Sequence, residues 1–244
     1  MHRLAERRAG IRPPIVAPPG RPMAVVSTHL DDAVLSCAQV LAANPGAVVV
    51  TVFSGGPDHW EQLTQWDADC GFRTGQDAIA ARKAEDVLAL AVLGARPRWV
   101  DLPEEQYGRP VTQEEVDDAL RAGLADAAPG TVVLAPVGVH HADHVLLGNA
   151  AVRLLAERPD LEWLLYEDLP YGSHHPDELA ARLAELRAGG LRLEPHDGLG
   201  SAPVAWKRAA MRRYRSQVRG LHEWIGPAVR DGAERYWRPV AADQ

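Results

Sequence analysis

The chain has few cysteines and no long apolar stretch, and each absence excludes a class of protein. Cys37 and Cys70 are the two cysteines among its 244 residues, and they form no C-x-x-C pair. We therefore expect neither a disulfide framework nor a zinc site built from thiolates. No run of 18 apolar residues occurs, so no membrane-spanning segment is expected. Residues 1–22 contain Arg and Pro but lack the apolar core of a secretion signal, which predicts a cytoplasmic protein.

Basic residues are also scarce relative to acidic ones. The chain has 26 Lys and Arg against 33 Asp and Glu, a net charge of −7. Because nucleic-acid binding favours a basic surface, this balance argues against a nucleic-acid partner. Apolar residues make up 46% of the chain and charged residues 24%, which is ordinary for a globular protein. The length suits one large α/β domain with a substantial core.

Short apolar runs alternate with segments of helical periodicity along most of the chain. The expected strands are residues 23–26, 47–53, 98–102, 131–135 and 162–167. The expected helices are 32–44, 77–93, 113–127, a segment ending near 157, 176–187 and 203–218. This alternation predicts a single α/β domain, a Rossmann-like sheet of mostly parallel strands with helices on both faces. We expect an N-terminal arm (1–22), this domain (23–220) and a C-terminal tail packing on it (221–244).

A polar cluster follows the first expected strand. His29, Asp31 and Asp32 stand between the apolar run 23–26 and an Ala- and Leu-rich segment with helical spacing. Imidazole and carboxylate are the usual ligands of a catalytic zinc ion that lacks thiolates. One H-x-D-D turn cannot direct every group at one ion, so one carboxylate would be left facing a bound water. The alternative is that an aspartate caps the helix and His29 is a surface residue.

A second cluster follows the fourth expected strand, where His141, Asp143 and His144 begin a helix. The two histidines are three residues apart and are therefore neighbours on one helical turn. Asp143 between them can orient a histidine as a hydrogen-bond acceptor. In a sheet of order 3-2-1-4-5, the carboxyl ends of strands one and four flank the crevice where ligands bind. The two clusters together therefore favour one joint metal site over two independent caps.

The pair H-x-D-D and H-x-D-H resembles the PIG-L/LmbE-like family of zinc-dependent N-acetylglucosaminyl deacetylases. Agreement extends to Arg82 and Glu85 in an R-x-x-E-D helix and to K-x-x-A-x-x-x-Y-x-S-Q at 207–217, so the resemblance covers residues 23–217. The residues of these motifs most resemble those of a branch of the family that is associated with bacterial natural-product and glycan modification. The resemblance implies a hydrolase that removes an acyl group, in particular acetyl, from an aminosugar or its glycoconjugate.

The chain departs from the commoner H-P-D-D-E motif of this family. Leu30 stands in place of Pro and Ala33 in place of Glu, and neither position supplies a metal ligand. Glu104 stands where family members often carry Asp after strand three. The metal chemistry is therefore expected to persist, while the substrate class is open.

The resemblance also implies roles for the clustered residues. One Zn²⁺, or another divalent metal, would be held by His29, Asp32 and His144. Asp31 would be the general base, and His141 would stabilise the oxyanion or protonate the leaving amine, with Asp143 holding His141. Three nitrogen and oxygen ligands leave a position for water, whose pKa then falls to about 7.

Candidate substrate contacts lie in two segments. The polar segment 54–76 carries Trp60, Trp66 and Arg73, and structureless loops of this length tend to be lids or binding loops. Trp66, Arg73 and Tyr171, which follows strand five, are the expected contacts to a small-molecule aminosugar or glycoconjugate. The alternative for the loop is a surface excursion with its own apolar cluster. The pair 174–175 precedes a proline and is expected to begin a helix rather than form a second metal site.

Three other functions are weighed against this interpretation. A nucleotide-binding Rossmann module needs a glycine-rich fingerprint after strand one, and residues 28–33 have none. A non-catalytic metal-binding protein has no use for the unligated Asp31. An amide hydrolase acting on a non-sugar substrate stays open, and the sequence does not indicate the oligomeric state.

Overall fold

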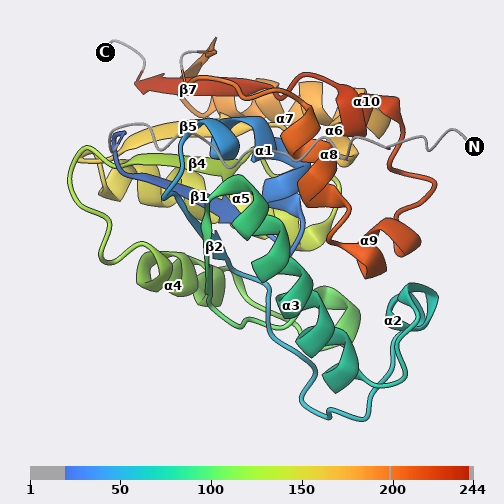
Figure 1. Ribbon diagram of the computed structural model, residues 1–244. Helices are drawn as coiled ribbons and strands as arrows, with labels where there is room; N and C mark the ends of the chain where they lie inside the picture. The colour runs from blue at the N-terminus through green and yellow to red at the C-terminus, as the bar shows by residue number, and fades with distance from the viewer. Residues whose placement is uncertain (1–19, 198, 242–244) are drawn as a thin grey trace, which may run out of the picture.

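A seven-stranded sheet forms the centre of the computed structural model, which describes residues 20–197 and 199–241 (Figure 1). The strands are β1 (Met23–Ser27), β2 (Val48–Thr51), β3 (Arg96–Trp99), β4 (Val132–Pro136), β5 (Glu162–Tyr166), β6 (Leu191–Pro195) and β7 (Tyr236–Ala241). Their order in the sheet is β3-β2-β1-β4-β5-β7-β6. The first five strands pair in parallel, whereas β7 is antiparallel to β5 and β6. The expected order 3-2-1-4-5 and the Rossmann-like fold class are confirmed.

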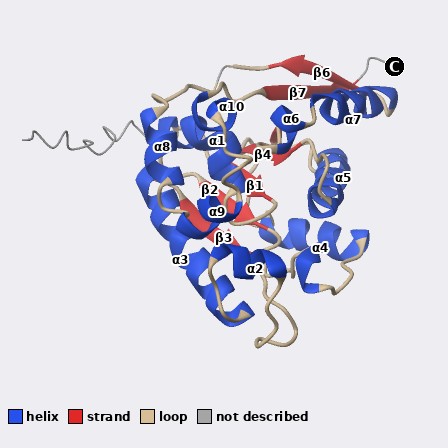
Figure 2. Cartoon of the chain, turned by 90° about the vertical axis from the view of Figure 1, so that its right-hand side faces the viewer, coloured by secondary structure: helices blue, strands red, loops and turns tan. Residues whose placement is uncertain are grey.

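Helices cover both faces of the sheet (Figure 2). They are α1 (Asp32–Ala43), α2 (Gln65–Cys70), α3 (Gly75–Leu93), α4 (Gln113–Gly123), α5 (Ala142–Glu157), α6 (Tyr171–His174), α7 (Pro176–Ala188), α8 (Ala205–Met211), α9 (Arg215–Gly220) and α10 (Pro227–Asp231), with a 3₁₀ turn at Glu105–Tyr107. Along β1, Val25 packs with α1, α3 and α8, while Ala24 and Val26 pack with α4, α5 and α7. Alternate side chains of a strand point to opposite faces, so one strand contributes to two cores. Among the helices of the described residues, none combines the length and the apolar composition of a membrane span.

Three expected elements differ from the structure. The third strand, expected at 98–102, is β3 at Arg96–Trp99. The segment 54–76, expected to be a structureless loop, contains α2, which Thr64 caps by accepting a hydrogen bond from the Asp67 amide (3.0 Å). The expected helix 203–218 is divided into α8 and α9. Tyr214, at the break, donates its hydroxyl hydrogen bond to Asp86 on α3 (2.7 Å), and Ser216 donates to Glu85 on the same helix (2.6 Å). These hydrogen bonds with α3 stabilise the break between α8 and α9.

The two antiparallel strands β6 and β7 were not expected. Both carry exposed charged residues: in β6, Leu193 is buried while Arg192 and Glu194 are exposed, and in β7, Arg238 is exposed. In β7, Tyr236 pairs with Tyr166 of β5, seventy positions earlier in the chain, and such pairing leaves no local signal. Most of the expected N-terminal arm, residues 1–19, lies outside the described residues.

Buried carboxylates tie the C-terminal segment to the domain. Glu167, directly after β5, receives two hydrogen bonds from Arg235, both 2.5 Å long. Glu234 accepts from the Gln39 amide on α1 (3.1 Å) and lies 3.5 Å from the buried Lys207 ammonium on α8. The segment that precedes β7 is thereby attached to the end of β5 and to helices α1 and α8.

Two glycines set the distance between α5 and the loop after β4. Gly138 has φ +82°, in the left-handed region, and a Cβ there would lie 2.6 Å from the His144 carbonyl oxygen. A Cβ on Gly148 would lie 2.6 Å from the Val137 carbonyl oxygen and 2.7 Å from the Gly138 Cα. The first two turns of α5, including His144, therefore approach this loop as closely as the backbone allows.

We predict that Gly148→Ala destabilises the protein by about 1–3 kcal/mol, because the methyl group meets backbone atoms that cannot rotate away. Without this clash, replacing Gly by Ala would stabilise the helix by up to about 1 kcal/mol. A decrease in the free energy of unfolding would therefore indicate the close approach of the two backbones. Urea unfolding measures the difference. Gly189→Ala is the control, since its Cβ would meet nothing closer than 3.4 Å, and it should change stability by less than about 0.5 kcal/mol. Equal effects of the two substitutions would contradict the argument.

Candidate active site

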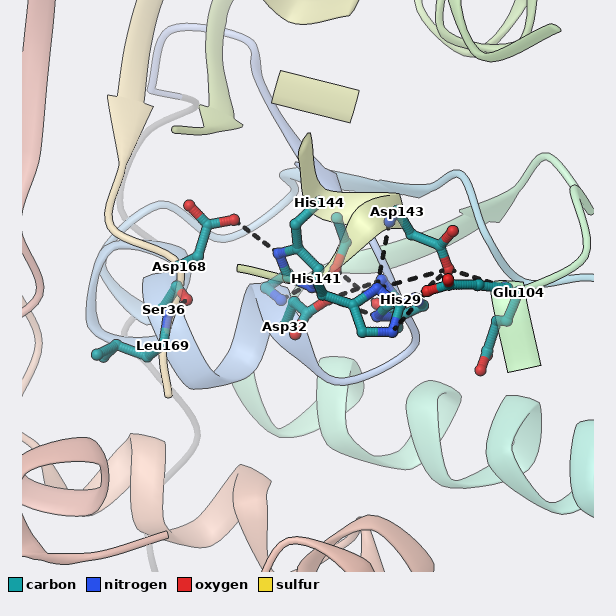
Figure 3. Close-up of polar contacts among 12 residues, drawn as sticks. His29, Asp32, Ser36, Glu104, His141, Asp143, His144, Asp168 and Leu169 are labelled. Carbon is teal, nitrogen blue, oxygen red and sulfur yellow. Dashed lines mark hydrogen bonds and ion pairs between the residues drawn. The ribbon is translucent and has the colours of Figure 1, made fainter. Parts of the chain in front are cut away.

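The turn after β1 and the turn after β4 face each other at one edge of the sheet (Figure 3). The first turn is shaped by Ser27, whose hydroxyl donates to the His29 carbonyl oxygen (2.7 Å) and accepts from the Ala33 amide (3.0 Å). Asp31 occupies the N-cap position of α1 but makes no side-chain cap hydrogen bond. The carboxylate of Asp31 is therefore not used for capping.

The three expected metal ligands lie together in the space between these turns. His29 Nδ1 is 3.3 Å from Asp32 Oδ2, and His144 Nε2 is 3.1 Å from the same oxygen. One ligand atom from each of the three residues lies within 4.8 Å of the others, and all three side chains are buried. His144 Nε2 has no hydrogen-bond partner among the described residues. Buried polar atoms normally have a hydrogen-bond partner, so a buried imidazole nitrogen without one, close to a carboxylate, is suited to bind a metal ion. The donor set of two imidazoles and one carboxylate therefore fits a divalent ion.

The second nitrogen of each histidine meets a carboxylate. His29 Nε2 is 3.0 Å from Asp143 Oδ2, and His144 Nδ1 is 2.7 Å from Asp168 Oδ1 (Figure 3). Asp168 is itself held, since it accepts a hydrogen bond from the Gly138 amide (2.9 Å). Metal-binding histidines usually donate their other ring N–H to such a group, which fixes the tautomer and the ring orientation.

Asp168 was not among the expected site residues. It is the second residue after β5, the strand beside β4. Its position at the carboxyl end of that strand is the one feature of the sequence that could have identified it as a site residue. The next residue, Leu169, donates its amide hydrogen bond to Ser36 on α1 (3.0 Å). The segment after β5 is thus fixed against the helix that begins at the metal ligands.

Asp143 does not hold His141 as expected. Its Oδ2 atom is 3.9 Å from His141 Nδ1 but forms the 3.0 Å contact with His29 and accepts from the Glu105 amide (3.1 Å). His141 is instead the N-cap of α5 and accepts from the Asp143 amide through Nδ1 (3.2 Å). Because an accepting Nδ1 carries no proton, neutral His141 has its N–H at Nε2.

The electrostatics of the site favour positive charge at its centre. Burial disfavours a charged His144, but Asp32 and Asp168 outweigh burial and raise its pKa to about 9. Burial likewise opposes a charged His29, yet Asp143 and Asp32 raise its pKa well above the ordinary value. The pKa of Asp32 is lowered despite burial, chiefly by His144. Groups that stabilise protons in this way also stabilise a bound cation in their place.

Two further titratable groups of the site, Asp31 and His141, have pKa values shifted in opposite directions. Burial, reinforced by the charge on Asp32, raises the pKa of Asp31 to about 7. Burial and the positive charges on His29 and His144 lower the pKa of His141 to about 4. Near neutral pH, Asp31 can accept a proton, and His141 is a neutral hydrogen-bond donor.

A cavity of about 340 Å³ opens over these residues. His29, Asp31, Asp32 and His141 lie in its wall, and three aromatic side chains flank it: Trp66, Tyr171 and Trp224. Trp66 and Tyr171 are two of the three expected substrate contacts. The third, Arg73, is exposed and lies outside the lining, whereas the buried Arg82 belongs to it.

Arg82 and Glu104 form a buried ion pair in the cavity wall. Their side chains are 2% and 7% exposed, and Arg82 Nη1 lies 2.6 Å from Glu104 Oε1. Glu104, the position noted as unusual, thus supplies a charge partner to Arg82. Trp60 is 50% exposed and packs near Gly56 rather than in the cavity. Trp224 had no sequence signal, because it belongs to the tail.

Comparison with known proteins is consistent with this geometry. A family model described as PIG-L, GlcNAc-PI de-N-acetylase, matches residues 24–155. The chain is 28% identical to 2'-N-acetylparomamine deacetylase of Niallia circulans, over 80% of each chain. Two solved structures are each 26% identical to it. The A40926 pseudoaglycone deacetylase has a TM-score of 0.67, covering 93% of this chain and 100% of that one. A triple-mutant deacetylase of the teicoplanin biosynthetic pathway has a TM-score of 0.71, covering 91% and 99%.

We predict that His29, Asp32 and His144 bind one divalent metal ion tightly per chain, and that Asp168→Asn weakens this binding by about 10–100-fold. The asparagine keeps the size of the side chain but no longer supplies a charged acceptor for His144 Nδ1–H. Equilibrium dialysis of the metal-free protein against buffered zinc measures both quantities.

The control for Asp168→Asn is Asp126→Asn, which breaks an exposed ion pair with Arg98 and should leave the affinity unchanged. The double variant His29→Ala/His144→Ala should lose the tight ion. Retention of that ion by the double variant, or equal affinities of the two asparagine variants, would contradict the assignment.

Proposed function

The chain belongs to the PIG-L family, and from that premise we propose that it is a metal-dependent hydrolase that removes an N-acetyl group from an aminosugar conjugate. The observation that supports this most directly is the pairing of a buried two-histidine, one-aspartate cluster with an unligated aspartate. His29, Asp32 and His144 converge on one another, while Asp31 lines the same cavity without a capping role. A purely structural metal site would have no use for Asp31.

Zn²⁺ is the metal proposed for this cluster, because two imidazoles and one carboxylate are a common ligand set of catalytic zinc. When bound, zinc supplies Lewis acidity toward the amide carbonyl and activates water near neutral pH. His29 and His144 would bind it through the nitrogens that face Asp32. Their other nitrogens stay on Asp143 and Asp168, so neither ring can turn away.

Asp31 is the proposed general base. Its carboxylate takes the proton of the attacking water as the carbon–oxygen bond forms, and it returns this proton to the amide nitrogen as the carbon–nitrogen bond breaks. The products are acetate and the free amine of the sugar. His141, neutral and protonated at Nε2, donates a hydrogen bond to the amide oxygen as negative charge develops there.

We predict that Asp31→Asn keeps the metal but lowers kcat by about 10²–10⁴-fold, because asparagine cannot accept the proton. The wild-type rate should also fall toward acid as Asp31 becomes protonated, and burial and Asp32 raise the pKa of this carboxyl to about 7 in the metal-free protein. The sign follows from the role: a base must be ionised, and the ionised fraction decreases toward acid. Acetate release measured between pH 5 and 9, with metal content determined in parallel, checks both expectations.

Asp69→Asn is a suitable control, since Asp69 is an exposed residue of α2 that bonds to Gln65. It should keep the wild-type rate and pH profile. The base assignment is wrong if Asp31→Asn loses its metal yet recovers normal activity when metal is resupplied.

The aromatic flank of the cavity supports a conjugate rather than a free sugar as the substrate. Trp66 comes from α2, Tyr171 from α6 and Trp224 from the C-terminal segment. Flat apolar faces of this kind stack on sugar rings and on apolar aglycones. The names of two relatives also support a conjugated substrate, because they specify an N-acetylparomamine and a pseudoaglycone. Arg82 and Glu104 offer hydrogen-bonding groups to sugar hydroxyls on the same cavity wall.

We predict that an N-acetylglucosaminyl conjugate with an aromatic aglycone has a higher kcat/KM than free N-acetylglucosamine. Trp66→Ala and Trp224→Ala should each lower kcat/KM for the conjugate by about tenfold, because about 1.4 kcal/mol of stacking and burial is lost. Steady-state kinetics on the matched pair of substrates measure this.

Trp60→Ala is the matched control, because this tryptophan lies outside the cavity and should have no effect on the conjugate. The conjugate preference is refuted if free sugar and conjugate have equal kcat/KM. It is also refuted if Trp60→Ala has the same effect as Trp66→Ala.

A further inference from the structure

We propose that His140, His175 and Glu178 form a second, weaker binding site for a divalent transition-metal ion at the rim of the cavity. One ligand atom from each of these residues lies within 4.8 Å of the others. The site uses none of the residues assigned to deacetylation, so it goes beyond the proposed function.

Three separate segments bring the donors together. His140 lies in the loop between β4 and α5 and has φ +67°, in the left-handed region that is unusual for a residue with a Cβ. This conformation accompanies a parallel stack of its ring on that of His175, with centroids 3.9 Å apart and an interplanar angle of 14°. His175 precedes α7, and Glu178 is in the first turn of that helix. The structure confirms that residues 174–175 precede a helix, and it also places His175 beside His140.

The distances between donors match those of a metal site. His140 Nδ1 is 3.2 Å from one Glu178 oxygen and 3.3 Å from the other, and His175 Nδ1 is 3.4 Å from the nearer oxygen. Charge-assisted hydrogen bonds are shorter, about 2.7–2.9 Å. A tetrahedral zinc ion with bonds of about 2.0–2.1 Å separates neighbouring donors by about 3.3 Å. The contacts of Asp32 with His29 and His144, at 3.3 and 3.1 Å, have the same length.

His175 is otherwise uncommitted. Its Nε2 atom is buried and has no hydrogen-bond partner within the described part of the chain. Ligation requires the two rings to tilt from their parallel stack, and the exposure of His140 and Glu178, 33% and 49%, permits this. Two imidazoles and a carboxylate favour zinc, nickel or copper over magnesium or calcium.

The site should bind more weakly than the buried cluster. Its donors are open to solvent, and neither histidine has a carboxylate on its second nitrogen, whereas His29 and His144 both do. Absence of such partners typically costs about 10–100-fold in affinity. His140 lies in the cavity lining with its ring 5.2 Å from that of Tyr171. An ion there would join the loop preceding His141 to α7.

The test is calorimetric titration of the metal-free, full-length protein with Zn²⁺. We expect two sites, the second about tenfold or more weaker than the first. His175→Ala and Glu178→Gln should each remove the weaker site and keep the tight one. His174→Ala is the matched control: His174 donates to the Trp224 carbonyl oxygen (2.9 Å) and should leave both sites intact. The second equivalent of zinc should raise Tm in the wild type but not in Glu178→Gln.

The proposal is overturned if the wild type binds a single ion. It is equally overturned if both His175→Ala and Glu178→Gln retain the weaker site, because that site would then lie on other residues. Glu178→Gln keeps both histidine rings and the size of the side chain. It therefore tests whether the weaker site depends on these residues even if His175→Ala does not fold. Failure of the tight site would instead count against the proposed function, and the two results are distinguishable by affinity.

Discussion

The parallel pairing of β1 with β4 is the constraint on which the rest of the molecule depends. Met23 lies opposite Val132 and Val25 opposite Leu134, so both strands end at the same edge of the sheet. Parallel neighbours leave their carboxyl ends open to a crevice, and the helices that follow begin there. The turn with His29 and the turn with His144 are therefore brought into contact by the backbone, before any side-chain interaction is considered.

Once the turns meet, the cost of burying charge determines the details. Asp32 and both facing histidines are almost completely excluded from solvent, and an unpaired charge there would be strongly destabilising. Each histidine nitrogen in the cluster accordingly faces Asp32, Asp143 or Asp168. The close approach of Gly138 and Gly148 keeps α5 at the distance these contacts need. The same arrangement that satisfies the buried charges pre-orients the nitrogens for a cation.

The cavity above the cluster is assembled from segments far apart in the chain. Trp66 is placed by α2, which packs against α9, where Gly220 allows the indole ring to come close to the backbone. Trp224 is placed by its contacts with Tyr171 and His174, at 5.9 and 4.9 Å between ring centroids. The C-terminal segment therefore contributes Trp224 to the wall of the cavity, and β7 and the Arg235–Glu167 pair keep that segment in position.

The sequence by itself determined the parallel core, its strand order and the two turns, because apolar runs and short motifs are local patterns that survive in any context. It also placed Trp66 and Tyr171 in segments that follow strand ends. Tertiary structure alone decided which carboxylate meets which histidine: Asp143 faces His29 rather than His141, because His141 is used as a helix cap. It likewise decided that Arg73 and Trp60 are exposed outside the cavity lining, while Arg82 and Trp224 belong to that lining. These outcomes, like the pairing of β7 with β5, depend on contacts between residues distant in the chain, and such contacts leave no periodicity to detect.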